Sequence, residues 1–172
     1  MNKIIPFLLV VISLFLSDGT VFANTQNTTP YFEDHSRRVG YKTVDEAVKE
    51  FENHCNCEVK LPAKIPEIPF THEFGAFTKD EKNGVNDLLQ IRFVNREMKN
   101  NLFKVDIRSN KLDYEGKEYL LQDGTKGMYF ANHIFYFFVF EKNNLQYVVS
   151  IDKNVSDIDP PKVLLDIANS IE

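Results

Sequence analysis

The sequence predicts an α+β fold: a curved antiparallel sheet of about five to seven strands, packed by an N-terminal and a C-terminal helix. Two segments, one near each end of the chain, carry apolar residues at spacings of three and four, which is typical of amphipathic helices. Between them lie short apolar or alternating runs separated by turn residues. The connections between these runs are short, which indicates antiparallel neighbours.

The first part of the chain has the pattern of a secretory signal peptide. An apolar run over residues 4–16 follows Lys3, and Ala23 offers a small residue for cleavage. The run is shorter than the roughly 20 apolar residues that a membrane-spanning helix needs. We therefore expect residues 1–23 to be removed. Because no cysteine near Ala23 could accept a lipid, we expect no membrane anchor after processing, and a protein that is secreted or lies in the cell-wall space.

The rest of the chain is predicted to be a flexible leader, residues 24–40, followed by a single α+β domain, residues 41–172. The leader is polar and has no apolar period. The formal net charge of the protein is -5, and no basic stripe interrupts it. Nucleic acid is therefore not an expected partner, since proteins that bind it concentrate positive charge.

The N-terminal helix is predicted to begin after Thr43, because Thr43 and Glu46 have the spacing of a capping box. Its apolar stripe consists of Val44, Ala47, Val48, Phe51 and Cys55. Three prolines then predict an extended surface segment that ends near Phe70. The C-terminal helix is expected to open at Asp159 as its cap, followed by Pro160 in the first turn. Its apolar stripe consists of Val163, Leu164, Ile167, Ala168 and Ile171.

Seven runs between these helices have the length and composition of strands. They cover residues 72–77, 89–93, 103–107, 119–122, 127–131, 134–141 and 145–151. The second and third runs alternate apolar and polar residues, so each should bury one side only. The run at 134–141 instead has bulky apolar residues at both parities, so both of its faces should be covered. It is predicted to be a central strand. One alternative is a cupped sheet that encloses an apolar ligand next to Tyr136, Phe138 and Phe140, and another is a hydrophobic contact surface.

Cys55 and Cys57 are the cluster most capable of reactive chemistry. An even number of cysteines in an exported chain favours a disulfide. The loop that it closes is so small that the expected gain in stability is only about 1.6 kcal/mol. A thiol-disulfide redox function is the alternative, although both cysteines lie at the end of a helix rather than at its start. Too few ligands accompany them for a closed zinc site, so we expect no metal.

No stretch carries a specific catalytic signature. The serines lack the glycine-flanked setting of a hydrolase nucleophile. The segment from Gly124 to Gly127 lacks the full spacing of a phosphate-binding loop. We therefore expect a protein that is not an enzyme, with no catalytic residue and no cofactor.

Three segments resemble an uncharacterised domain family of secreted or membrane-anchored Gram-positive bacterial proteins. They are Leu61-Pro62 with Pro66, the strand Tyr147 to Ser150, and the closing stretch Leu164 to Ile171. The resemblance extends from Val44 to Ile171 and supplies no catalytic residue. That family is similar in outline to lipoprotein carriers with a curved antiparallel sheet, which adds to the case for a cavity.

These patterns favour a secreted, non-enzymatic binding or interaction domain of the bacterial cell envelope. A protein or an envelope component is the expected partner, and Phe70, His72 and Phe74 are the expected contact residues because they lie on an extended segment. The first alternative is a carrier of an apolar or lipid ligand lined by Tyr136, Phe138 and Phe140. The second is a redox protein that uses Cys55 and Cys57.

Overall fold

The computed structural model describes residues 31–172, except residues 81, 83–85, 98–99 and 156. The predicted signal peptide, residues 1–23, lies outside the described residues, as does the predicted leader up to residue 30. In chain order, the elements are α1 (Tyr31–Arg38), α2 (Val44–Cys55), β1 (His72–Thr78), β2 (Leu88–Asn95), β3 (Asn100–Arg108), β4 (Lys117–Leu120), β5 (Lys126–Ala131), β6 (Phe135–Lys142), β7 (Leu145–Asp152) and α3 (Pro160–Asn169).

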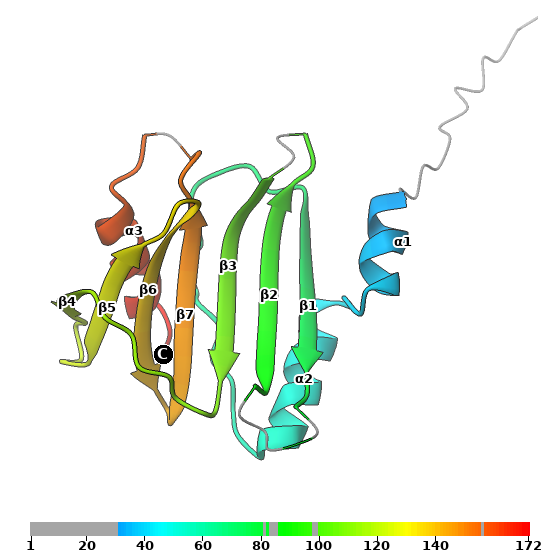
Figure 1. Cartoon of the computed structure of the whole chain (residues 1–172), viewed down its shortest axis with the longest axis horizontal. Helices are drawn as coiled ribbons and strands as arrows, with labels where there is room; N and C mark the ends of the chain where they lie inside the picture. Colours follow the sequence, from blue (N-terminus) through cyan, green and yellow to red (C-terminus); the bar gives the residue numbers. More distant parts are fainter. Residues whose placement is uncertain (1–30, 81, 83–85, 98–99, 156) are drawn as a thin grey trace, which may run out of the picture.

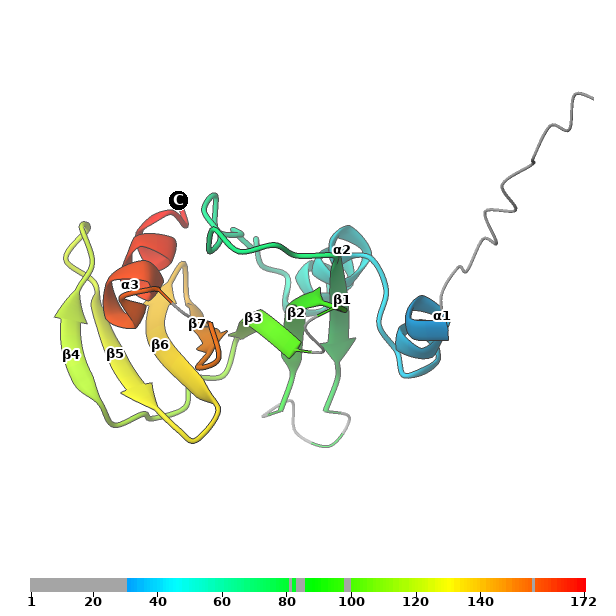
Figure 2. The same ribbon diagram turned by 90° about the horizontal axis from the view of Figure 1, so that it is seen from above.

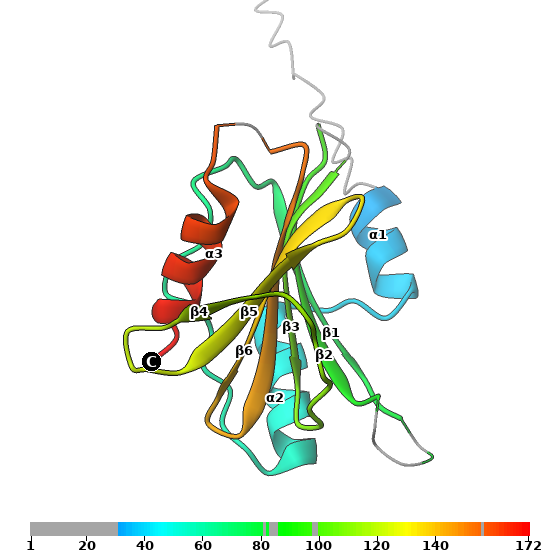
Figure 3. The same cartoon turned by 60° about the vertical axis from the view of Figure 1, so that its left-hand side comes forward.

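The strands form one seven-stranded antiparallel sheet in the order β1-β2-β3-β7-β6-β5-β4 (Figure 1). Two meanders make it up: β1 to β3, and β4 to β7. The pairing of β3 with β7 joins them. The connection 109–116 leaves β3 and crosses in front of β7 and β6 to reach β4 (Figure 1). Figure 3 shows the strands of the two meanders crossing at an angle, the twist usual for sheets. The predicted α+β class and antiparallel sheet are confirmed.

Helices α2 and α3 lie on the same side of the sheet (Figure 2). Helix α2 contacts β1 and β2, and α3 contacts β6 and β7. The proline-rich segment runs on this side as well, and Ser170 holds it: Ala63 N–H donates to the carbonyl oxygen of Ser170 at 3.3 Å, and Lys64 N–H to its hydroxyl at 3.1 Å. This layer covers a row of side chains that includes Ile91, Val105, Val149 and Phe138, none more than 1% exposed.

Helix α2 begins as predicted. The Thr43 hydroxyl accepts the N–H of Glu46 at 3.2 Å, and the Glu46 carboxylate accepts the N–H of Thr43 at 3.1 Å, which completes the capping box. The start of the helix is fixed to β1 because the backbones of Lys42 and Gly75 exchange two hydrogen bonds, of 2.8 and 2.9 Å. The first turn of α2 therefore sits directly on the sheet.

Three local predictions need correction. Part of the predicted leader, residues 24–40, is helix α1, which ends where Gly40 adopts a φ of +95° and which buries Ser36. Asp159 stands at the N-cap of α3, but its side chain makes no capping hydrogen bond. Pro161 at the second helical position has no N–H to donate, which removes one of the two donors that such a cap ordinarily uses. The predicted strand 119–122 is β4 at 117–120, because Leu121 already belongs to the hairpin turn and donates its N–H to Thr125 at 2.8 Å.

The close approach of α2 to the sheet requires glycine at position 75. A Cβ there would lie 2.6 Å from the Cβ of Ala47 and 2.9 Å from the carbonyl oxygen of Thr43. We expect Gly75→Ala to lower the free energy of unfolding by about 3 kcal/mol in urea denaturation, because the helix must shift or strain. The same substitution should cost at least about 1 kcal/mol less in an Ala47→Gly background, where the nearest atom is gone. A cost for Gly75→Ala near zero would contradict this packing.

Candidate binding face

The side of the sheet that faces away from α2 and α3 is named the bare face here. Side chains alternate along a strand, so the neighbours of the buried row point to it. The residues that point to this side are Phe74 on β1, Arg92 on β2, Lys104, Asp106 and Arg108 on β3, Ser150 and Asp152 on β7, Phe135 and Phe137 on β6, and Phe130 on β5. Of these, Arg92, Ser150 and Asp152 are buried beneath their neighbours. Neither α2 nor α3 covers this face, and the connection 109–116 crosses part of it (Figures 1 and 2).

Four half-buried rings form a continuous array on the bare face, which we call the aromatic ladder: Tyr114, Phe130, Phe137 and Phe135. The ring of Tyr114 stacks on that of Phe130, with centroids 5.6 Å apart, and Phe130 stacks on Phe137 at 4.9 Å. Phe135 continues the array at 6.1 Å from Phe137, with its ring tilted. Large rings with one side toward solvent supply contact area at little cost in conformational entropy, which is why interfaces are enriched in them.

The aromatic ladder ends at Lys104. The ammonium of Lys104 lies 3.4 Å from the centroid of the Phe135 ring, a cation–π contact. Register places Lys104 opposite Arg92 on one side and Ser150 on the other. Burial, assisted by the positive charge of Arg92, lowers the pKa of Lys104, while Asp106 and Asp152 act in the opposite direction. The protonated side chain is therefore held in a place that disfavours its charge.

The cations of the bare face outnumber the carboxylates that pair with them. Arg92 donates to Asp106 at 2.5 Å and to the carbonyl oxygen of Ile91 at 3.0 Å. Neither Lys104 nor Arg108 has a carboxylate within 4.0 Å among the described residues, and the Nε of Arg108 is buried without a hydrogen-bond partner there. The bare face therefore has a local excess of positive charge, although the formal net charge of the whole protein is -5.

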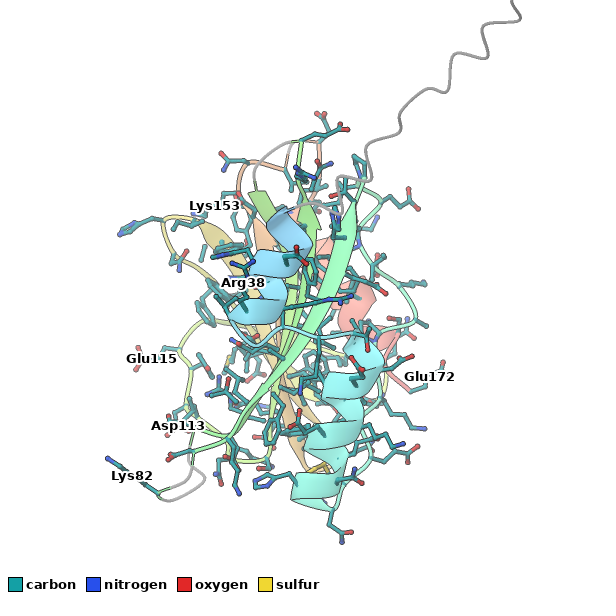
Figure 4. The ribbon with its side chains drawn as sticks, turned by 90° about the vertical axis from the view of Figure 1, so that its right-hand side faces the viewer. Arg38, Lys82, Asp113, Glu115, Lys153 and Glu172 are labelled. Carbon is teal, nitrogen blue, oxygen red and sulfur yellow. A yellow bond between two sulfur atoms is a disulfide. The ribbon has the colours of Figure 1, made fainter. Side chains whose placement is uncertain are left out.

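Charged side chains and a hollow lie at the borders of the bare face. Figure 4 shows Asp113 and Glu115 projecting from the crossing connection, well apart from Arg38 and Lys153. At the β1 end, a hollow of about 480 Å³ lies between the residues that follow α1 and the strand. It is lined by Arg37, Tyr41, Lys42, Thr43, Glu46, His72, Glu73 and Phe74.

The connection 109–116 is fixed to the sheet by Gln146 on β7. The side-chain amide of Gln146 accepts the N–H of Leu112 at 3.1 Å and donates to the carbonyl oxygen of Leu112 at 2.8 Å.

The residues expected to contact a partner separate in the structure. His72 and Phe74 lie together, with stacked rings 5.9 Å apart, and both line the 480 Å³ hollow. Phe74 also packs against Tyr41 at 6.1 Å. Phe70 instead packs on Phe93 at 5.4 Å, on the side of the sheet that carries the helices. Two of the three predicted residues therefore belong to one border of the bare face.

The residues expected to line a ligand cavity face the helices. Phe138 and Phe140 are 0% and 2% exposed, and Tyr136 packs partly buried against the same core. A Cβ on Gly127 would lie 2.4 Å from the ring of Phe138, and Phe140 stacks on Tyr147 at 5.3 Å. These contacts make them core residues of a closely packed layer. The sequence predicts that both faces of this strand, β6, are covered. Helices cover only the face that carries Phe138, whereas Phe135 and Phe137 point to the bare face.

The predicted disulfide between Cys55 and Cys57 is present at the end of α2, with the two Cα atoms 5.2 Å apart. Both cysteines are partly buried and border a polar hollow of about 580 Å³. Within the described ranges, no three side chains of His, Cys, Asp or Glu gather closely enough to hold a metal ion. Each helix in the described part of the chain is too short or too polar to traverse a bilayer.

Sequence reasoning missed the aromatic ladder and its cations as a site. The signals were present: Lys104, Asp106 and Arg108 alternate on a predicted strand, and the run at 134–141 is apolar at both parities. The sequence does not show that β3 pairs with β7, which places β3 and β6 on either side of β7 and brings these groups to one face. No protein family, curated protein or solved structure matches this chain. The geometry of the bare face is therefore the basis for assigning a function.

The position of Lys104 predicts a pH-dependent cost to stability. Its native pKa lies below the ordinary value of about 10.5, so between these two values the unfolded chain binds more protons and stability rises with pH. We expect Lys104→Met to raise the free energy of unfolding at pH 7, and this gain to shrink as the pH rises through that interval. Urea denaturation at several pH values measures it, with Lys49→Met on the exposed side of α2 as the control. A loss of stability at pH 7 specific to Lys104→Met would refute the prediction.

Proposed function

We propose that this protein is an exported interaction domain of the bacterial cell envelope that binds a protein partner on the bare face. The observation that carries the proposal is the aromatic ladder and its termination at Lys104, a cation that has no carboxylate within 4.0 Å among the described residues. Aromatic side chains and arginine are the groups that most often anchor protein interfaces. A curved sheet that presents this face would bring the two kinds of group toward a single partner segment.

The chemistry of the bare face favours a partner segment with one carboxylate close to apolar side chains. A carboxylate placed beside Lys104 would supply an anion that this cation lacks among the described residues. Phe137 lies two strands away from Lys104, which corresponds to about 10 Å at the usual spacing of strands. An extended peptide rises about 3.3 Å per residue, so an acidic residue and an apolar residue two to four positions apart would reach both groups.

The same charges disfavour a polyanion. Asp106, which is bonded to Arg92, lies between Lys104 and Arg108 on β3, so a chain of phosphates would meet a carboxylate along with the cations. The net charge of -5 adds a general repulsion. A single carboxylate in an otherwise apolar segment avoids both costs, and a protein surface readily supplies it.

The carrier and redox alternatives remain predictions. A carrier that used Tyr136, Phe138 and Phe140 would have to separate rings that now pack in the core, whereas the bare face needs no such opening. The outline resemblance to lipoprotein carriers does not identify a cavity next to these rings. The bare face therefore supports binding better than the helix-covered face supports transport.

A displayed library of random peptides tests the binding proposal. Residues 24–172 serve as bait, beside a Lys104→Gln variant and a Lys49→Gln variant that makes the same change on α2. We expect the unmodified domain and Lys49→Gln to enrich peptides with an acidic residue two to four positions from an aromatic or aliphatic one. Lys104→Gln should lose this enrichment.

For a peptide selected in this way, we expect both Lys104→Gln and Phe137→Ala to raise Kd at least about tenfold, which corresponds to about 1.4 kcal/mol each. The effect of Lys104→Gln should fall at high salt, because it removes a charge, whereas that of Phe137→Ala should not. Fluorescence anisotropy of the labelled peptide measures both. Enrichment that is equal for all three baits, or no enrichment at all, would count against the bare face as the binding site.

Export is tested separately by expressing the full chain in a Gram-positive host. We expect the mature protein outside the cytoplasm to begin at Asn24, because cleavage should follow Ala23. N-terminal sequencing of the extracellular and cell-wall fractions measures this. Recovery of the intact chain from Met1 in the cytoplasm would contradict the assignment to the envelope.

A further inference from the structure

We propose that the Cys55–Cys57 disulfide is a thiol–disulfide exchange site, which accepts two electrons from a dithiol of a partner protein. This activity is separate from the binding proposed for the bare face. It rests on the access to the bridge, on the way the backbone around it is held, and on the position of each sulfur relative to α2.

The disulfide is open to an approaching polypeptide. Both cysteines border a hollow of about 580 Å³, and Asn56 and Glu58 form the rest of that wall. The opposite wall is Ser109 and the turn between β6 and β7, where Asn143 and Asn144 have φ of 52° and 64°. Two successive residues with positive φ are typical of a tight, well-defined hairpin turn. The hollow is therefore polar and firmly framed, and a loop of another protein could enter it.

The fold around the bridge is held without help from the disulfide. Glu52 accepts the N–H of Cys57 on its carbonyl oxygen at 3.3 Å, and its carboxylate accepts the N–H of Val59 at 2.8 Å. The N–H of Lys60 donates to the hydroxyl of buried Tyr147 at 3.3 Å. Asn56 caps the helix in the left-handed conformation, with φ 50°. These contacts leave both thiols near one another after reduction, so the bridge can form again.

The two sulfurs are not equivalent. Cys55 is the last residue of α2, and its sulfur lies 3.7 Å from the carbonyl oxygen of Glu52. The carbonyl end of a helix carries partial negative charge, which disfavours a thiolate at Cys55. Cys57 lies beyond the helix end and is the better leaving group. A disulfide is cleaved faster when the departing thiol is the more acidic one. The incoming thiolate should therefore attack Cys55.

A partner thiolate attacks Sγ of Cys55, a mixed disulfide forms, and Cys57 leaves as a thiolate that takes a proton from water. The second thiolate of the partner then attacks the partner's own sulfur in the mixed disulfide. Cys55 is released and protonated, the partner dithiol becomes a disulfide, and the bridge has gained two electrons. The chain has two cysteines in all, so no third cysteine of its own can compete for the mixed disulfide.

The test uses the oxidised chain after residue 23, with dithiothreitol as the dithiol and glutathione as the monothiol. We expect dithiothreitol to reduce the bridge under native conditions, and removal of the reductant in air to restore it. The reduced protein and a Cys55→Ser/Cys57→Ser variant should both keep a dispersed NMR spectrum. Reduction only in denaturant, or unfolding of both the reduced protein and the double variant, would overturn the proposal.

A trapping experiment checks the direction of attack. The oxidised protein is treated briefly with glutathione, free thiols are blocked with iodoacetamide, and the modified peptide is sequenced by mass spectrometry. We expect at least tenfold more glutathione on Cys55 than on Cys57. The reverse ratio, or equal amounts, would overturn the assignment of Cys55 as the attacked sulfur. The proposed binding on the bare face should be unchanged in the Cys55→Ser/Cys57→Ser variant, so the two proposals can fail independently.

Discussion

The pairing of β3 with β7 is the interaction on which the rest of the structure depends. It joins one meander, β1 to β3 with α2, to the other, β4 to β7 with α3. All eight residues of β7 are buried, so this strand lies at the centre of the molecule and is covered on both faces. Six cross-strand pairs, from Phe103 with Ile151 to Arg108 with Gln146, set the register. A slip by one residue would turn every side chain of one meander to the wrong face.

The same pairing assembles the bare face from two sources. The first meander supplies the cations Arg92, Lys104 and Arg108. The second supplies three rings of the aromatic ladder, and the connection between the meanders supplies the fourth, Tyr114. Lys104 reaches Phe135 because β3 and β6 are both neighbours of β7. Beneath these groups, polar side chains of β7 are buried and satisfied: Gln146 bonds to Leu112, and Asp152 accepts two hydrogen bonds from Asn154. A strand with fully apolar sides would be cheaper to bury, but it would not hold the crossing connection in place.

Much of the fold follows from local sequence patterns, and the site does not. All seven predicted strands are present, and the capping box at Thr43 begins α2 as expected. Alternation identifies strands and their two faces, but it carries no information on which distant strand pairs with which. The pattern of alternation therefore does not predict that Lys104 lies opposite Ser150. For the same reason alternation does not show that Phe70 packs on Phe93, which lies on a strand distant in sequence from the proline-rich segment. Helix α1 was not predicted because it is short and strongly polar overall.

A partner bound across the bare face would contact both meanders at once. Its carboxylate would engage side chains from β3, and its apolar groups would engage rings from β5 and β6. Such a ligand binds only when β3 and β7 are paired in register, so binding and the central pairing of the sheet are thermodynamically linked. The half-buried charge of Lys104 then has a physical role. The charge of Lys104 lowers the stability of the free domain, and a bound anion would offset this loss of stability. The bare face would therefore select partners that carry a negative charge.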